Sequence, residues 1–302
     1  MKAWIIGCAL GAAAVLSGCS AVRIGYDQAP TLVWWWLDGY LDFDTPQAPA
    51  VKDALAQWFA WHRATQLPDY AELLAAAQVQ VLQPATPAQV CRWNDELRAR
   101  AETALTHAVP PAAELLPRIG PAQLEHLEQR YRRSNREFEQ DFLQADPDER
   151  RAAAVERTID RAEMLYGRLD ARQRQLVAAG VEASPFDPAA WLAERREVQA
   201  QVLQTLARLT AGGPARADRD SNVAGLKALA QRLLRAPPGP YRDYQRRLTE
   251  YNCAFIARLH NSTMPAQRLA ARDRLRGWEE DLRILAARKP PADAARPSPA
   301  LH

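Results

Sequence analysis

The residue with the clearest chemistry in the sequence is Cys19, whose thiol follows Ser17 and Gly18 at the end of an apolar segment. Residues 3–16 of that segment carry no charge, and Lys2 precedes them. The segment is shorter than the roughly 20 residues that a comfortable membrane span needs, so we expect a signal peptide over residues 1–18. Small residues before the thiol leave the neighbouring peptide bond open to a peptidase.

The tetrapeptide Leu16-Ser17-Gly18-Cys19 resembles the lipobox of bacterial lipoproteins. The resemblance implies that the Cys19 sulfur receives a diacylglycerol, that residues 1–18 are removed, and that the new amine is acylated with a fatty acid such as palmitate. Several acyl chains would anchor the protein stably in the bilayer. The residue after the lipidated cysteine is Ser20 and not Asp. By resemblance to the sorting rules of bacterial lipoproteins, this implies export to the outer membrane, on its periplasmic side. The alternative is an ordinary secretory signal in which Cys19 falls at this position by chance.

Two cysteines remain once Cys8 leaves with the signal peptide and Cys19 is lipidated. In an oxidising periplasm Cys91 and Cys253 can form a disulfide that ties the two halves of the chain together. They can equally remain as two buried free thiols, and the sequence leaves both alternatives open.

Composition and motifs argue against several function classes. With 48% hydrophobic and 25% charged residues the chain is typical of a globular protein, which disfavours wholesale disorder and a polytopic membrane protein. A net charge of +3 does not indicate a nucleic-acid partner. The sequence has no glycine-rich phosphate loop, no nucleophile elbow and no histidine or cysteine metal motif. We therefore predict no enzyme, no cofactor and no metal site.

Helical periodicity runs through the mature chain and predicts an all-α fold. The 13 glycines are few, and the 22 prolines punctuate the helices. In the N-terminal third we expect helices over residues 46–63, 68–82, 87–107 and 112–118. The all-helical periplasmic domain is predicted to span residues 45–289, and the Pro/Ala-rich tail over residues 290–302 is predicted to be disordered.

Two helical hairpins are predicted inside that domain, over residues 121–180 and 240–288. Each has two apolar seams of helical spacing across a short turn, so we expect a multi-helix array of antiparallel hairpins. The hairpins also look like weak repeats, because Asn135-x-x-Phe138 corresponds to Asn252-x-x-Phe255.

Residues 19–44 form an aromatic segment that contains Trp34, Trp35 and Trp36. Near a lipidated Cys19 these indoles could lie in the membrane interface, where Trp is common. They could instead pack under the helical domain. Three consecutive helical residues point about 100° apart, so we favour packing in the core, with one indole at the membrane.

A second resemblance concerns helix starts. Periplasmic hairpin proteins of the Spy/CpxP type carry Leu-Thr-x-x-Gln motifs, and four segments of this chain are similar to them: 43–47, 85–89, 119–123 and 169–173. The family resemblance implies a hairpin face that holds unfolded clients or a sensor kinase without ATP. Capping of the helix at Pro87 by Thr86 is a simpler explanation of one segment. As a whole the chain is similar to an uncharacterised family of proteobacterial lipoproteins.

These observations lead to one functional hypothesis and one alternative. The first is a non-enzymatic outer-membrane lipoprotein that contacts the bilayer through acylated Cys19 and binds an envelope protein or an unfolded client. The alternative is a structural tether for an envelope complex or the cell wall, with an enzyme a distant third. The candidate protein-binding surface on the first hairpin consists of Tyr131, Phe138, Phe142, Ile159 and Tyr166, which could also form the core.

Overall fold

A computed structural model describes residues 21–211 and 218–288 of the chain. Within these ranges every regular element is a helix, which confirms the all-α prediction. The signal peptide over residues 1–18, Cys19 and the tail over residues 290–302 lie outside the described residues.

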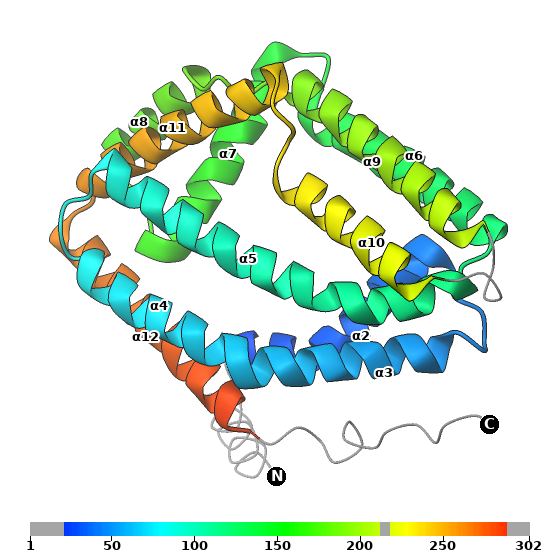
Figure 1. Cartoon of the computed structure of the whole chain (residues 1–302). Helices are drawn as coiled ribbons and strands as arrows, with labels where there is room; N and C mark the ends of the chain where they lie inside the picture. The colour runs from blue at the N-terminus through cyan, green and yellow to red at the C-terminus, as the bar shows by residue number, and fades with distance from the viewer. Residues whose placement is uncertain (1–20, 212–217, 289–302) are drawn as a thin grey trace, which may run out of the picture.

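The helices form an open frame (Figure 1). In it α2 and α3 make one side, α4 and α12 a second, α8 and α11 a third, and α6 and α9 a fourth, while α5 and α10 cross between them. In chain order the α-helices are α2 (Ala21–Leu41), α3 (Ala48–Trp61), α4 (Leu67–Gln80), α5 (Pro87–Leu115), α6 (Pro121–Phe142), α7 (Pro147–Tyr166), α8 (Ala171–Glu182), α9 (Pro188–Thr210), α10 (Arg219–Leu234), α11 (Pro240–Asn261) and α12 (Pro265–Ala287).

The helices pair antiparallel, as expected, but most partners are far apart in the sequence. α12 packs along α4, α6 along α9, and α10 along α5 (Figure 1). The two predicted hairpins are therefore corrected: neither α6 with α7 nor α11 with α12 forms a packed pair, because their apolar seams are buried elsewhere. Phe138 of α6 stacks on Trp191 of α9, with ring centroids 4.4 Å apart. Ile159 of α7 packs in a cluster with residues of α8 and α11.

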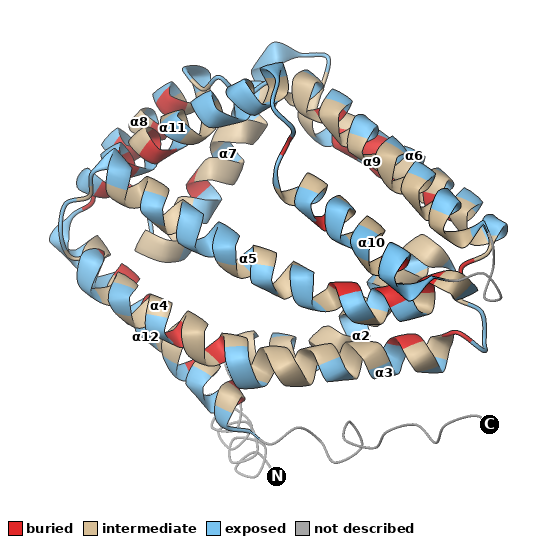
Figure 2. Ribbon diagram, in the orientation of Figure 1, coloured by how far each residue is buried: buried red, intermediate tan, exposed pale blue. Residues whose placement is uncertain are grey.

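Burial follows the helix pairs, and Figure 2 shows buried residues in patches along the lines where helices meet. One cluster joins Ile159, Val177 and Phe255 from α7, α8 and α11. A second joins Val81, after α4, to Ala271 and Leu275 of α12. The expected repeat of Asn135 and Asn252 does not extend to their surroundings, since Asn135 is buried and Asn252 is exposed.

Prolines end fewer helices than the sequence analysis expected. Residues 48–80 form one continuous helical run, in which a π-helical turn, His62–Gln66, lies between α3 and α4. A wider turn there accommodates Pro68, which lacks an N–H donor and would crowd the preceding turn of a regular α-helix. Likewise α5 continues through Pro110 and Pro111, so the predicted separate helix over residues 112–118 is its last part plus a short 3₁₀ turn.

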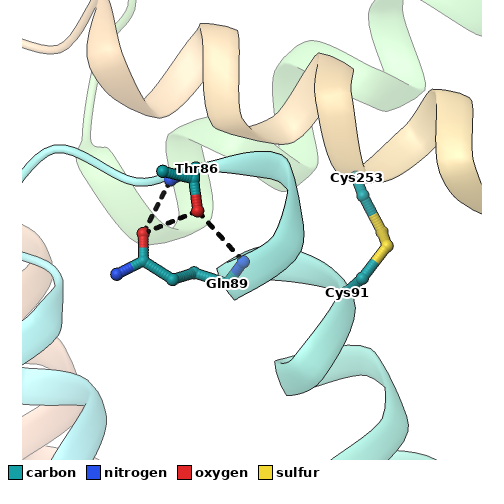
Figure 3. The surroundings of a disulfide bond; sticks show 4 residues. All are labelled: Thr86, Gln89, Cys91 and Cys253. Carbon is teal, nitrogen blue, oxygen red and sulfur yellow. Dashed lines mark hydrogen bonds between the residues drawn. A yellow bond between two sulfur atoms is a disulfide. The ribbon is translucent and has the colours of Figure 1, made fainter.

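A disulfide joins Cys91 of α5 to Cys253 of α11 (Figure 3), with an Sγ–Sγ distance of 2.05 Å and Cα atoms 5.4 Å apart. The structure therefore takes the disulfide alternative over two free thiols. The bond closes a loop across 162 residues. In the chain-entropy description, a loop of that length corresponds to about 5 kcal/mol of stabilisation through the unfolded state.

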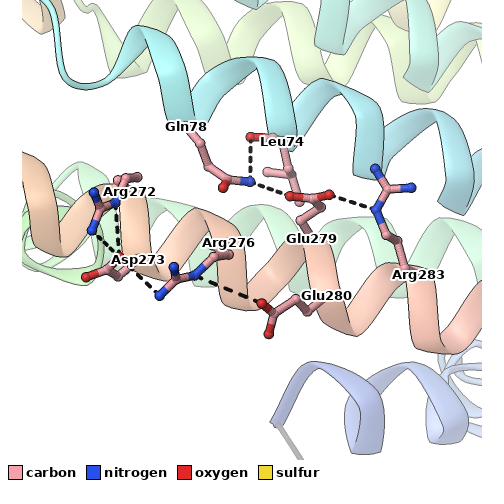
Figure 4. A network of polar contacts seen from close by, with 8 residues as sticks. All are labelled: Leu74, Gln78, Arg272, Asp273, Arg276, Glu279, Glu280 and Arg283. Carbon is pink, nitrogen blue, oxygen red and sulfur yellow. Dashed lines mark hydrogen bonds and ion pairs between the residues drawn. The ribbon is translucent and has the colours of Figure 1, made fainter.

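The α4–α12 pair carries polar contacts along its solvent edge (Figure 4). Glu279 accepts hydrogen bonds from Gln78 Nε2 at 2.5 Å and from Arg283 Nε at 2.7 Å. The bond from Arg283, followed by that from Gln78, lowers the pKa of the Glu279 carboxyl. Exposed ion pairs contribute little to stability, so the buried apolar seam holds α4 and α12 together. The polar network helps to fix how far the two helices are shifted along each other.

At the start of five helices a glutamine folds back on the turn before it. Its side-chain Oε1 accepts a hydrogen bond of 2.7–3.0 Å from the backbone N–H three residues earlier. Such bonds pair backbone donors at the helix start that have no partner within the helix. These residues are Gln47, Gln89, Gln123, Gln173 and Gln267.

Four of these side chains form two reciprocal pairs, which we call the glutamine pairs. Gln47 Nε2 donates to Gln123 Oε1 at 3.1 Å, and Gln123 Nε2 returns a bond of 2.8 Å. Gln173 and Gln267 do the same at 2.7 and 3.0 Å. Each Nε2 also donates to a backbone carbonyl in the segment that precedes the partner's helix. In the order Gln47, Gln123, Gln173 and Gln267, the acceptors are the carbonyls of Arg118, Leu41, Ser262 and Arg168.

The fifth glutamine, Gln89, has no glutamine partner among the described residues, and an asparagine holds its loop instead. The Ala85 N–H donates to Asn261 Oδ1 at 2.8 Å, and Asn261 Nδ2 donates to the Ala85 carbonyl at 2.9 Å. Local capping is thus shared by all five positions, whereas long-range pairing belongs to four.

Replacing Gln173 separates these two contributions. Gln173→Ala removes a cap, both bonds to the half-buried amide of Gln267 and the bond to the Ser262 carbonyl, so we expect a loss of about 2–4 kcal/mol in the free energy of unfolding. The matched variant Gln89→Ala removes only a cap and should cost about 1 kcal/mol. Urea unfolding followed by circular dichroism measures both; equal losses would contradict a structural role for the pairs.

Candidate functional site

The residues proposed from sequence as one binding surface lie in four separate places. Phe138 stacks on both Phe142 and Trp191. Ile159 belongs to the α7–α8–α11 cluster, and Tyr166 lies against the α4–α12 cluster. Tyr131 contacts Tyr40 of α2, and burial raises the pKa of its hydroxyl to about 12. These residues do not form one protein-binding surface.

The three consecutive tryptophans of α2 divide between the core and the outside. Trp34 is half-buried, stacks on Phe43 with centroids 5.6 Å apart, and has Lys52 Nζ 4.6 Å from its ring centroid. Trp35 and Trp36 are 63% and 60% exposed. Packing in the core therefore holds for Trp34 alone.

Two histidines, the buried His260 and the half-buried His62, take part in structural hydrogen bonds. His260 contacts the Tyr166 hydroxyl through Nδ1 at 2.8 Å and the Gln83 carbonyl through Nε2 at 2.7 Å. His62 in the π-helical turn contacts the Tyr26 hydroxyl at 2.9 Å. Burial lowers the pKa of both imidazoles, that of His62 to about 4. Both rings are therefore neutral at physiological pH and act as hydrogen-bonding parts of the frame.

The most distinctive concave feature is an open cleft of about 610 Å³ between α7, the loop after α8, and the helices α9 and α11. We call it the arginine cleft. Its walls combine guanidinium groups from α7 with aromatic and aliphatic side chains from the other elements, and with the carboxylate of Glu182 on α8, which pairs with Arg151. The lining residues include Phe142, Arg150, Arg157, Arg161, Phe186, Trp191, Tyr251 and Phe255.

Helical spacing places the cleft arginines on one face of α7. At 100° per residue Arg150, Arg157 and Arg161 lie within about 40° of each other. The apolar seam that includes Ile159 lies on the opposite side of the helix, where it is buried. Burial of the seam therefore turns the three guanidinium groups toward the cleft.

The three arginines differ from their neighbour Arg151 in their partners. Arg151 forms ion pairs with Asp148 and Glu182. Among the described residues, no carboxylate forms an ion pair with Arg150, Arg157 or Arg161. Arg150 donates to the Gln144 and Ala145 carbonyls, and the guanidinium of Arg157 lies 4.5 Å from the centroid of the Phe142 ring. The cleft thus holds positive charge that the described chain does not neutralise.

The floor of the cleft is aromatic and firmly positioned. The Tyr251 hydroxyl donates to the Gly180 carbonyl at 2.6 Å. A Cβ at position 180 would overlap the Phe255 ring, so glycine allows α8 and α11 to approach closely there. Phe186, on the loop at the rim, is 40% exposed. A rigid floor with an exposed aromatic edge is suited to apolar side chains of a bound molecule.

Chemically, the cleft offers hydrogen-bond donors, positive charge and ring faces. Guanidinium groups bind carboxylates through charge-assisted hydrogen bonds, and aromatic rings bind apolar side chains. The sequence analysis did not identify these arginines as a site. Their 3.6-residue spacing opposite the α7 seam was the available signal, but the aromatic floor comes from segments that sequence spacing does not relate to α7.

Comparison with known proteins gives one match. The model of a family of unknown function matches residues 39–220, which include α7 and Trp191 of the cleft but not Tyr251 or Phe255. No curated protein and no solved structure matches the chain. Among residues 21–211 and 218–288, no helix combines the length and the apolar character needed to cross a membrane.

If the cleft arginines serve binding and not folding, their removal should leave stability unchanged. We expect Arg161→Gln to alter the free energy of unfolding by less than about 0.5 kcal/mol. The comparison variant is Arg195→Gln on α9, since Arg195 donates to Asn135 Oδ1 and Ser134 Oγ, both on buried residues. Gln199 Nε2 still donates to Asn135 Oδ1, but the buried Ser134 hydroxyl loses its bond, which should cost about 1–3 kcal/mol. Thermal unfolding of both variants checks the contrast, and a large loss in Arg161→Gln would assign it a structural role.

Proposed function

The chain belongs to DUF6279, a family of unknown function whose model covers more than half of its length, and we propose for it a binding role without catalysis. In this proposal it is an outer-membrane lipoprotein whose helical frame faces the periplasm. The arginine cleft binds a segment of another protein that carries acidic and apolar side chains.

The observation that carries this proposal is the set of arginines in the cleft that have no carboxylate partner. Elsewhere in the described frame some arginines pair with a carboxylate, such as Arg132, Arg196 and Arg276, and others do not. In the cleft, three arginines without a carboxylate partner lie on one face of one helix and line one concavity. Three neighbouring guanidinium groups without such a partner repel one another, and an incoming carboxylate would relieve that repulsion. Unneutralised charge beside an aromatic floor therefore favours an acidic ligand with apolar side chains.

A protein segment suits this cleft better than a nucleic acid or a small anion. The chain is nearly neutral overall, whereas nucleic-acid binding usually draws on a broad basic surface. The floor residues Trp191, Tyr251 and Phe255 offer apolar area that a small anion would leave unused. A Spy/CpxP-like role is the form of this proposal in which the segment belongs to an unfolded client; a fixed envelope partner would make the protein a tether.

Membrane attachment is supported by the tetrapeptide Leu16-Ser17-Gly18-Cys19 and by the short distance in sequence between Cys19 and the first helix of the frame. Helix α2 begins at Ala21, two residues after the proposed lipidation site. Acylation of Cys19 would hold the frame directly at the bilayer surface without a long linker.

Binding to the cleft can be tested with model peptides. The full-length protein should bind a peptide of alternating Glu and Phe and should discriminate against the Lys/Phe counterpart. Reversing two charges in Arg157→Glu/Arg161→Glu should weaken binding by about tenfold or more, equivalent to at least about 1.4 kcal/mol. Fluorescence anisotropy at several salt concentrations provides the measurement.

The control for this experiment is Arg276→Glu, which reverses an exposed arginine on α12 that pairs with Asp273. It should bind the Glu/Phe peptide as the wild type does. Equal binding of both peptides, or equal loss in cleft and control variants, would contradict the proposed cleft. Suppression of aggregation of a denatured client at stoichiometric amounts would then distinguish client binding from attachment to one fixed partner.

The lipid anchor has its own test. Intact-mass spectrometry of the wild-type protein should show loss of residues 1–18 and the added mass of a diacylglycerol and an amide-linked acyl chain. Cys19→Ala should remove that mass and leave either an uncleaved precursor in the membrane or a soluble chain. A Cys19→Ala protein that remained acylated would refute the anchor.

A further inference from the structure

The outward face of α2 is apolar and exposed in the described chain, and the Gly39 carbonyl near its C-terminal end contacts His126 Nε2 of α6 at 3.3 Å. The exposed residues of this helix include four large hydrophobic side chains, with exposures of 52–63%. At 100° per residue they lie within an arc of roughly 140°. We call this arc the α2 outer face; it comprises Ala21, Ile24, Gly25, Gln28, Thr31, Leu32, Trp35, Trp36 and Gly39.

No residue of the α2 outer face carries a charge. The charged side chains of this helix lie at its border or on its inner side and are engaged by the frame. Arg23 pairs with Asp281 of α12 at 3.0 Å. Asp27, at the border of the arc, pairs with Arg63 and Arg288 at 3.1 and 2.7 Å.

The inner side of α2 is already occupied by the rest of the protein. Tyr26 bonds to His62, Trp34 stacks on Phe43, and Tyr40 contacts Tyr131 of α6. Packing against α3, α6 and α12 fixes the rotation of α2 about its axis. The direction in which the outer face points is therefore a fixed property of the frame.

We propose that the α2 outer face lies flat on the lipid bilayer, at the boundary between headgroups and acyl chains. This inference rests on the proposed anchor at Cys19. Only Ser20 lies between Cys19 and the start of α2 at Ala21, and two residue steps span at most about 7 Å, so the helix begins at the membrane surface. The occupant of the face is thus the bilayer in which the acyl chains are embedded.

The character of the face determines the orientation of the helix. A helix of 21 residues is about 31 Å long. Standing upright, it would expose its apolar arc to water along that length. Lying down, it buries the arc in lipid and places Trp35 and Trp36 where indoles are favoured. Acyl chains and an amphipathic helix together give a stable, oriented attachment.

This orientation has a consequence for the arginine cleft. In Figure 1, α7, α8 and α11 lie at the end of the frame opposite the side formed by α2 and α3. With α2 on the bilayer, the helices that line the cleft lie at the other end of the frame, where a segment of another protein can reach them.

The test uses the full-length, processed protein reconstituted into vesicles of phosphatidylethanolamine and phosphatidylglycerol. A fraction of the lipid carries bromine on the acyl chains, either close to the headgroup or close to the chain end. Bromine quenches tryptophan fluorescence only at short range. We expect quenching by the shallow label to exceed quenching by the deep label, and to fall about threefold in Trp35→Phe/Trp36→Phe.

The matched control is Trp93→Phe, because Trp93 lies on α5, where its indole donates to Gln80. This variant should retain the quenching of the wild type. Phenylalanine at two exposed positions should leave folding intact, which circular dichroism checks. Unchanged quenching in the double variant would overturn the proposal, as would concentration-dependent dimerisation that the double variant abolishes, since a second copy would then cover the face.

The same sample separates this proposal from the one on which it rests. Intact mass reports acylation of Cys19, whereas quenching reports the position of α2. Acylated protein without tryptophan quenching refutes the lying helix alone; protein without acyl mass refutes the anchor.

Discussion

Burial of side-chain amides at helix starts is the constraint on which this frame depends. A buried amide must have its donors and acceptor paired, or the fold loses the desolvation energy of each group. In the glutamine pairs, each amide caps its own helix, bonds to its partner and donates to the partner's loop. One side chain therefore makes all three kinds of hydrogen bond. Two helix starts that are far apart in the sequence must come together for these bonds to form.

The remaining contacts follow from where these starts are held. With the start of α12 fixed beside that of α8, α12 is free to lie along α4, and its seam is buried there. The disulfide between Cys91 and Cys253 then links α5 to α11. A frame fixed in this way accommodates three arginines on α7 that have no carboxylate partner among the described residues.

The two proposed surfaces give the molecule a direction. Helix α2 has an uncharged apolar face beside the proposed lipid anchor, and α7 presents its arginines at the other end of the frame. Both helices are amphipathic, but the polarity of their exposed faces is opposite. The inner side of each packs on the frame, so the packing that stabilises the fold also sets which chemistry each helix presents outward: apolar and uncharged on α2, basic on α7.

Local physical rules made the sequence informative about class and helix starts. Periodicity of 3.6 residues predicted the all-α fold, and the spacing of Gln123 and Gln173 from their helix starts marked those positions. Tertiary structure decided the partners. Capping acts over three residues and is visible locally, but nothing near Gln173 specifies Gln267, which lies 94 residues away. An apolar seam likewise shows that a helix is buried without showing against what, so α6 and α7 read as a hairpin although each packs elsewhere. Proline rules failed at Pro68 and Pro110 because packing of the continuous helix outweighed a local cost.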